Sequence, residues 1–389
     1  MKRLIHLFIA AAVVAASPPS LAETEIRVAT FNVSLNRSKA GELIDDLRAG
    51  NEQARDVARI LQAVRPDIVL LNEFDFDEAG EAIRLFQTNY LESETDGSQP
   101  LILPHVYSAP VNTGVASGLD LNRDGQTDGP ADAWGFGRYP GQYGMVVLSR
   151  FPIEREGVRT FQKFLWKDLP NAAAPVNPDD GTSWYPSETW NKLRLSSKSH
   201  WDVPISIGSR TLHVLASHPT PPAFDGPEDR NGRRNHDEIR FWAEYISGEE
   251  KPWLKDDGGR SGGLGVGQSF VILGDQNADP IDGASYQNAI QQLLKHPAVN
   301  NDFTPSSDEG VSAAKQQAGA NQNHKGNPAH DTGDFSDKVV GNLRADYVLP
   351  SRTIEVTDGG VFWPTAAQPL AHTIKCSDHR LVWLTLRLP

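Results

Sequence analysis

The side chains best suited to phosphate or metal chemistry in this sequence stand at the ends of four short apolar runs. They are Asn32, Glu73, His218, Asp275 and Asn277. In sheets built from strands and helices, ligands bind outside the carboxyl ends of the strands. We therefore expect these amide, carboxylate and imidazole groups to converge on one polar pocket.

The C-terminal part of the chain adds Asp346 and the adjacent pair Asp378 and His379. Oxygen ligands without cysteine suit a hard divalent cation, Mg²⁺ or Mn²⁺. With a histidine beside the cation, the set matches metal-assisted attack of water on a phosphoester. An Asp or Asn after a strand can also simply form a turn, so the hypothesis depends on the whole set and not on any single residue.

The elements that must position these residues alternate between short apolar strands and amphipathic helices. Residues 26–33 indicate a strand, residues 52–64 repeat apolar side chains at helical spacing, and residues 68–71 form an apolar strand. This order favours packed sheets covered by helices. Further strands are expected at 144–148, 211–217, 269–273, 344–349 and 380–388, and helices near 234–247 and 284–295.

Two stretches, at about 105–143 and 155–205, do not follow this rhythm. They are rich in Gly, Pro, Asn, Asp and Trp, which predicts long loop insertions with a functional or ion-binding role. The glycine-rich stretch 258–267 precedes a strand and does not open a helix, so we interpret it as a flexible connection and not as a phosphate-binding loop. Length alone suggests two domains, but we expect a single domain over 23–389.

Seven short motifs carry a resemblance to a known family. They are Ala29-Thr30-Phe31-Asn32, Leu71-Asn72-Glu73, GMVVLSRFP at 144–152, Ser217-His218, Gly274-Asp275-Gln276-Asn277, Arg344-Ala345-Asp346-Tyr347 and Ser377-Asp378-His379. In type and order they resemble the endonuclease/exonuclease/phosphatase superfamily, which includes DNase I-like nucleases, abasic-site endonucleases, bacterial sphingomyelinases and inositol polyphosphate 5-phosphatases. The resemblance covers about 25–389. It implies a DNase I-like four-layer α/β sandwich, in which two packed mixed β-sheets are flanked by helices.

The resemblance also implies roles around the cation. Glu73 would be the principal metal carboxylate, with Asn32 and Asp378 in the same cation shell. Asp275 would orient and deprotonate the attacking water, and Asn277 would hold the phosphate or that water. Hydrolysis of a phosphoester requires both the base and the cation.

The remaining matching residues would act on the phosphate and the leaving group. His379 would bind a non-bridging oxygen or protonate the leaving group, and Asp346 would fix its tautomer and raise its basicity. His218 would hydrogen-bond the scissile phosphate. Asn72 departs from the Gln that is frequent in the family, and residues 219–226 are unlike recognised nucleases, which leaves the substrate open.

An Asp- and Asn-rich stretch in the first insertion resembles the first part of an EF-hand-type calcium loop. Its glycine is Gly125, but Ala131 stands where a bidentate Glu is expected, followed by Asp132. One interpretation is a structural Ca²⁺ site, separate from the catalytic cation; the other is an Asx-rich turn without an ion. The candidate ligands are Asp120, Asn122, Asp124, Gln126 and Asp128.

Basic residues near these motifs are candidates for substrate contacts. Arg230, Arg233 and Arg234 follow the His218 loop, and Arg194 and Lys198 lie in the second insertion. They would bind phosphate or an anionic head group; alternatively, they belong to a solvated loop and helix start. Aromatic residues also crowd both insertions, either as a local core or as a surface that stacks bases or meets lipid.

The first 22 residues have the pattern of an export signal. Lys2 and Arg3 precede the apolar run 4–16, which is too short to span a bilayer, and small residues end the segment. We therefore predict a secreted or periplasmic bacterial protein without an integral membrane segment. The single cysteine, Cys376, excludes both an internal disulfide and a tetrahedral cysteine-zinc site.

These features together predict a divalent-metal-dependent phosphoesterase that hydrolyses phosphodiester or phosphomonoester bonds. Its substrate would be a small molecule, a lipid head group or a nucleic acid, and no obligate protein partner is expected. An extracellular nuclease of the same fold is an alternative, which the net charge of −13 and the lack of a basic stripe weaken. A catalytically silent calcium-binding surface module is another, against which the intact set of candidate residues argues.

Overall fold

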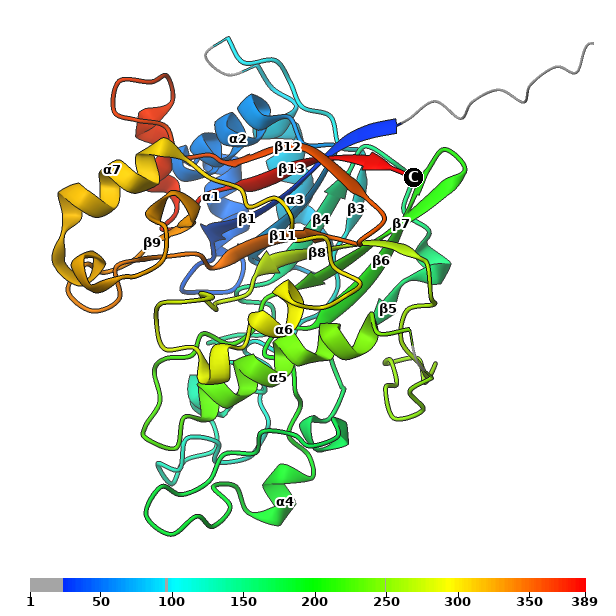
Figure 1. Ribbon diagram of the computed structural model, residues 1–389, viewed down its shortest axis with the longest axis vertical. Coiled ribbons are helices and arrows are strands. Elements are labelled where there is room, and N and C mark those ends of the chain that lie inside the picture. Colours follow the sequence, from blue (N-terminus) through cyan, green and yellow to red (C-terminus); the bar gives the residue numbers. More distant parts are fainter. Residues whose placement is uncertain (1–23, 95–96, 249) are drawn as a thin grey trace, which may run out of the picture.

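Two stacked β-sheets form the centre of the computed structural model, which describes residues 24–94, 97–248 and 250–389 (Figure 1). The first sheet has the strand order β12-β13-β1-β2-β4-β3, and the second has the order β11-β8-β7-β6-β5. β1 pairs with β2 and β7 with β8 in parallel, whereas the other neighbours are antiparallel, so both sheets are mixed. The expected export signal at 1–22 lies outside the described residues.

The first sheet is made of β1 (Thr24–Leu35), β2 (Ile68–Phe74), β3 (His105–Tyr107), β4 (Met145–Ser149), β12 (Glu355–Val361) and β13 (Val382–Leu388). The second is made of β5 (Arg159–Thr160), β6 (His200–Ile207), β7 (Arg210–Ser217), β8 (Ser269–Asp275) and β11 (Asp346–Pro350). A short ribbon pairs β9 (Gly333–Asp334) with β10 (Asn342–Leu343). The α-helices are α1 (Glu42–Ala49), α2 (Glu52–Val64), α3 (Glu81–Phe86), α4 (Ser187–Trp190), α5 (Arg230–Tyr245), α6 (Gln291–Leu294) and α7 (Asp308–Gln317).

Alternation of apolar side chains along the strands generates the layers. On β2, Ile68 and Leu70 belong to the core between the sheets, whereas Val69 and Leu71 face the core beneath α1, α2 and α3. A third core packs α5 and α6 onto the outer face of the second sheet, as Figure 1 shows. Helix, sheet, sheet and helix therefore form four layers, and the expected sandwich is confirmed.

Most of the expected elements are confirmed with small shifts of their ends. The helix expected at 52–64 is α2, which begins after the Asn51 cap and ends where Arg65 takes a left-handed conformation. The strand expected at 269–273 is β8, which extends through Asp275. The helix expected near 284–295 is wrong in extent, because only a 3₁₀ turn at Tyr286–Asn288 and the four residues of α6 are helical.

The insertions also differ from expectation at their ends. β3 opens the first insertion and pairs with β4. β5 and most of β6 fall within the second, which is therefore shorter than 155–205. The sequence analysis did not predict β6, because the polar run before it and Pro204 obscure the alternation of the apolar side chains Trp201, Val203 and Ile205.

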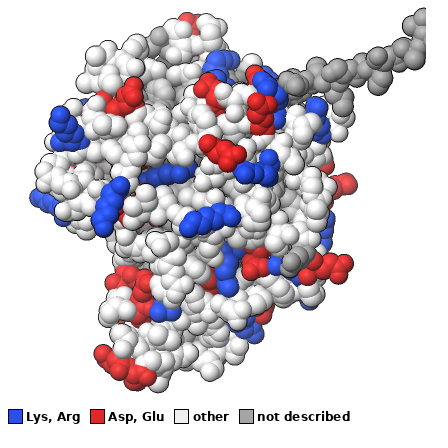
Figure 2. Space-filling view, in the orientation of Figure 1, with Lys and Arg blue, Asp and Glu red and all other residues white. Residues whose placement is uncertain are grey.

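The described surface shows no continuous charged stripe on the face in Figure 2, where Lys and Arg are scattered among Asp and Glu. Within the described ranges, no helix has the length and apolar character needed to cross a bilayer. Cys376 is buried with a free thiol.

Candidate active site

The two sheets bring their polar strand ends to the same place. Asn32 on β1 pairs with Asn72 on β2, and Asp275 ends β8 opposite Asp346 on β11. Asn72 connects the sheets, because its Oδ1 accepts a hydrogen bond from the Asp275 backbone N–H (3.2 Å) and its Nδ2 donates to the Ser217 carbonyl (3.4 Å). The shorter amide that replaces the family's usual Gln is therefore a structural bridge between the layers.

Backbone conformation at the strand ends turns the side chains into the site. Glu73 and Asn277 both have left-handed backbones, with φ of 58° and 52°. Such conformations cost non-glycine residues free energy and gather at functional sites. Gly274, with φ of 147°, has to be glycine, because a Cβ there would lie 2.0 Å from the Ser217 carbonyl oxygen. This close approach lets β7 and β8 present His218 and Asp275 side by side.

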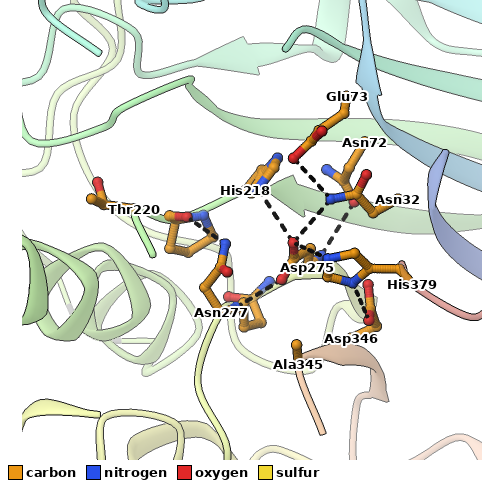
Figure 3. Close-up of polar contacts among 12 residues, drawn as sticks. Asn32, Asn72, Glu73, His218, Thr220, Asp275, Asn277, Ala345, Asp346 and His379 are labelled. Carbon is orange, nitrogen blue, oxygen red and sulfur yellow. Dashed lines mark hydrogen bonds and ion pairs between the residues drawn. The ribbon is translucent and has the colours of Figure 1, made fainter. Parts of the chain in front are cut away.

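Asp275 is the centre of the cluster (Figure 3). Its Oδ2 accepts a hydrogen bond from Asn32 Nδ2 (3.1 Å) and lies 3.3 Å from His218 Nε2 and 3.5 Å from His379 Nε2. Its Oδ1 accepts the Asn277 backbone N–H (2.9 Å). Burial alone would raise the pKa of Asp275, but the two histidines and Asn32 hold it below its usual range. Asp275 is thus an ionised carboxylate at neutral pH.

His379 and Asp346 form a buried pair beside Asp275. His379 Nδ1 lies 2.8 Å from Asp346 Oδ2, which also accepts a hydrogen bond from Thr332 Oγ1 (2.8 Å). Burial alone would lower the pKa of His379, but Asp346 and Asp275 together raise it to about 10. The ring is therefore an imidazolium at neutral pH, suited to donate a proton or to bind an anionic oxygen.

His218 differs from His379 in its charge. Burial lowers the pKa of His218, and the nearby Lys198 ammonium lowers it further. His218 is therefore neutral, and its Nδ1 is buried without a hydrogen-bond partner among the described residues. A neutral imidazole that faces Asp275 can serve as a hydrogen-bond donor.

Glu73 lies on the other side of Asn32. Asn32 Nδ2 donates to Glu73 Oε1 (3.1 Å) as well as to Asp275, and Asn36 Nδ2 donates to Glu73 Oε2 (2.9 Å). Two carboxylates that converge on one amide create a negative potential, and oxygen donors suit Mg²⁺ or Mn²⁺. The carboxylate oxygens of Glu73 therefore fit a hard divalent cation, whereas the Asn32 Nδ2 donor lies between Glu73 and Asp275, and Asn32 Oδ1 accepts the Ser34 N–H (3.2 Å).

A second arrangement of possible metal ligands overlaps this one. Asp275, Asp346 and His379 have ligand atoms within 4.8 Å of one another. Two members of this group, His379 Nδ1 and Asp346 Oδ2, lie 2.8 Å apart and bond each other. Asp378, the third expected metal ligand, is exposed at the rim, where Ser34 Oγ donates to its Oδ1 (3.4 Å).

Most of the basic residues expected to bind substrate have other partners. Arg230 pairs with Glu228, Arg233 lies over the Tyr286 ring, and Arg194 donates to Asn112 Oδ1. Arg234 is half-buried and donates to four main-chain carbonyls, those of Trp134, Arg194, Leu195 and Ser196. The structure therefore uses Arg234 to hold loops together.

Lys198 is the exception among the five. It is 7% exposed, and the carboxylates that act on it include Glu73 and Asp275. The structure thus brings Lys198 to the strand-end cluster.

Two supporting residues of the site escaped the sequence analysis. Asn36 bonds Glu73, and Thr332 bonds Asp346. Asn36 has a weak signal in the sequence, since it is a polar residue just after β1. Thr332 has none, because it reaches Asp346 from a loop that only the tertiary fold places there.

The expected calcium loop is exposed, and its side chains bond to its own backbone. Asp120 accepts the N–H groups of Asp124 and Gly125, and Asp124 accepts that of Gln126. Asp132, by contrast, is buried and bonds the N–H groups of Leu121 and Gly129. Calcium binding stays a prediction.

Comparison with known proteins places this geometry in a family. Three similar solved structures are an endonuclease/exonuclease/phosphatase from Beutenbergia cavernae (17% identity, 94% of this chain and 72% of that one, TM-score 0.49), a family protein from Leptotrichia buccalis (14%, 93% and 100%, 0.48) and the human Nocturnin catalytic domain with bound sulfate (13%, 96% and 100%, 0.44). No curated protein sequence matches the chain. The family model described as "Endonuclease/Exonuclease/phosphatase family" matches residues 29–379. The chain therefore belongs to the endonuclease/exonuclease/phosphatase family, whose members act as nucleases or phosphatases on phosphoester bonds.

Proposed function

We propose that the protein is a divalent-metal-dependent phosphoesterase that hydrolyses phosphodiester or phosphomonoester bonds by attack of water. The observation that carries the proposal is Asp275, an ionised and buried carboxylate that faces His218, His379 and Asn32. These groups come from β1, from the end of β7, from β8 and from the segment before β13, and they meet at one point. Mutual contacts of this kind are what acid–base chemistry on a bound phosphoester requires.

The residues near the attacking water have separate roles. Glu73, Asn32 and, from the rim, Asp378 would hold Mg²⁺ or Mn²⁺, which when bound would offset charge on the phosphoryl oxygens and lower the pKa of water. Asp275 orients the water and accepts its proton. Asn277 Nδ2 donates to the Pro219 carbonyl (3.1 Å), which fixes the amide beside Asp275 for contact with the phosphate.

The two histidines have different roles in the reaction. His379, kept protonated by Asp346 and Asp275, donates a proton to the leaving oxygen. His218, kept neutral by burial and by Lys198, has one N–H, and its Nε2 faces Asp275 Oδ2 at 3.3 Å; with substrate bound, that N–H would donate to a phosphate oxygen. The division supplies one base, one acid and one neutral donor around a single phosphorus centre.

The first 22 residues support a secreted or periplasmic location, which we include in the proposal on sequence grounds alone. At such a location, substrates come from outside the cytoplasm. A calcium ion in the loop around Asp124 would stiffen the first insertion without taking part in catalysis.

The test offers the purified chain bis-p-nitrophenyl phosphate, p-nitrophenyl phosphate, inositol phosphates, plasmid DNA and phospholipid vesicles, each with Mg²⁺ or Mn²⁺ and with EDTA. We expect turnover of at least one substrate, its loss with EDTA, and a fall of roughly 10²–10⁴-fold in the Asp275→Asn variant. Asp179→Asn, at an exposed position, is the matched control and should keep full activity. Turnover that survives both EDTA and Asp275→Asn would contradict the proposal.

A further inference from the structure

Lys198 is a buried cation for which the protein supplies no counterion in contact. The residue is 7% exposed, and the described residues provide no hydrogen-bond acceptor or ion-pair partner for its ammonium. Its Nζ is not among the fully buried unpaired atoms, so it keeps some contact with solvent. Burying an unpaired ammonium costs several kcal/mol, so lysines normally extend their charge into water. A cation held inside without a partner is suited to receive an anion.

The fold places this cation beside the phosphate-binding end of the site. Lys198 precedes β6 by two residues, and the first residue of β6, His200, pairs with Ser217, which directly precedes His218. Ser197 Oγ donates to the main-chain carbonyl of His218 (3.3 Å). The backbones that carry Lys198 and His218 are therefore in contact.

Glu238 on α5 holds both backbones in place. Its Oε1 accepts the Ser197 N–H and its Oε2 accepts the Thr220 N–H, both at 2.6 Å. The two carboxylate oxygens are thus bonded to the neighbours of Lys198 and His218. Glu238 positions the two side chains without pairing with the Lys198 ammonium.

The charges near Lys198 belong largely to the site. Burial lowers the pKa of the Lys198 ammonium, whereas the nearby Glu73, Glu238 and Asp275 carboxylates act in the opposite direction. Lys198 in turn lowers the pKa of His218. The carboxylate of this cluster that could serve a second metal ion, Asp346, is already bonded to His379 and Thr332.

We infer that Lys198 supplies the second positive charge of a one-metal site and binds a non-bridging oxygen of the scissile phosphate. This inference rests on the proposed function and specifies how the phosphoryl charge is balanced: by one divalent cation near Glu73 and by the Lys198 ammonium. Lys198 is the catalytic cation, and Glu238 is a positioning residue.

The test compares Lys198→Met with the wild-type chain, using inorganic phosphate as the probe. In the presence of Mn²⁺, phosphate should raise the melting temperature of the wild-type chain and inhibit turnover of bis-p-nitrophenyl phosphate. In Lys198→Met, we expect phosphate inhibition to weaken about tenfold or more and kcat/KM to fall roughly 10²-fold, as when one transition-state donor is removed. Calorimetric titration should give one Mn²⁺ per chain in both proteins.

Lys192→Met is the matched control, because Lys192 is exposed on the loop after α4 and pairs with Glu188. It should bind phosphate and turn over substrate like the wild-type chain. If Lys198→Met fails to fold, Lys198→Gln is measured by the same criteria. The number of Mn²⁺ ions bound per wild-type chain is measured without any variant.

The outcomes separate this inference from the proposed function. Phosphate binding that is lost in Lys198→Met supports the inference even if no tested substrate is hydrolysed, which would count against the proposed function alone. Phosphate binding that is unchanged in Lys198→Met, or two Mn²⁺ ions per wild-type chain, would overturn the inference while leaving hydrolysis intact.

Discussion

The strand-end cluster around Asp275 and the loop around Asp124 are both rich in aspartate and asparagine, yet their oxygens have different partners. Asp275 is 1% exposed and faces side chains from β1, the β7 end and the segment before β13. Asp124 is exposed and bonds the backbone of its own loop. A carboxylate whose hydrogen bonds all go to its own loop stabilises the shape of that loop. A carboxylate that faces side chains from several distant elements is suited to be a reactive centre.

A second comparison concerns two cations, the half-buried Arg234 and the buried Lys198. Arg234 donates to four main-chain carbonyls, whereas Lys198 has no acceptor among the described residues. Burial alone therefore does not mark a functional cation. What distinguishes Lys198 is that the described residues offer its ammonium no partner, and we propose that an anion takes this place.

The largest effect expected from breaking the strand-end cluster is on metal binding. Glu73→Gln should lower kcat/KM by roughly 10³-fold and abolish the rise in melting temperature on adding Mg²⁺, because it removes the proposed principal metal carboxylate. Steady-state kinetics and thermal melts with and without Mg²⁺ measure both effects. Glu78→Gln, at an exposed position nearby, is the control, and an undiminished Mg²⁺ effect in Glu73→Gln would assign the metal elsewhere.

Substitutions of Arg234 and Lys198 should differ in their effects on stability and activity. Arg234→Met should lower the free energy of unfolding by roughly 2–4 kcal/mol, because four carbonyls lose their donor. Lys198→Met should not lower it, because it removes a buried charge without stranding an acceptor. Urea unfolding of both variants measures this, with Arg352→Met as an exposed control. Equal destabilisation by the two substitutions would show that both cations are structural.

Asp331 offers a buried carboxylate outside the catalytic cluster. Burial and the neighbouring Asp279 and Asp282 raise its pKa from 3.8 to about 8. Below pH 4 the carboxyl is protonated in the folded and the unfolded chain alike. Between pH 4 and 8 only the unfolded chain releases the proton, so stability falls as pH rises, and the loss is complete above pH 8.

Replacing this carboxyl should remove that pH dependence. Asp331→Asn should be more stable than the wild-type chain at pH 9, by roughly 2–5 kcal/mol at most, and similar to it near pH 4. Thermal melts between pH 4 and 9 measure the difference, with Asp179→Asn as the exposed control. Parallel stability profiles for Asp331→Asn and the wild-type chain would contradict the raised pKa.

The smallest effect is expected in the Asp-rich loop. If it binds calcium, millimolar Ca²⁺ should raise the melting temperature by the equivalent of about 1 kcal/mol, and the double variant Asp120→Asn/Asp124→Asn should lose this rise without losing activity. Differential scanning calorimetry checks the prediction. A wild-type chain that is indifferent to Ca²⁺ would establish the Asx-rich turn as the correct interpretation.

Much of the fold followed from local patterns. Helical spacing over 52–64 and the apolar run at 68–71 each gave an element close to its observed bounds, because side-chain periodicity is a property of neighbouring residues. Residues 155–205 were less predictable. Their polar start and Pro204 obscured β6, whose place is fixed by pairing with β7.

By itself, the sequence determined the types of reactive group and their position at strand ends, since both depend on residue identity and local alternation. Only the tertiary structure decided which groups meet. Asn32 and Asp275 are 243 residues apart and bond across two sheets, and Asn72 links the sheets that carry them. Among five candidate basic residues, only folding decided that Arg234 would be surrounded by carbonyls and Lys198 would lack an acceptor, because burial and hydrogen-bond partners arise when distant segments pack.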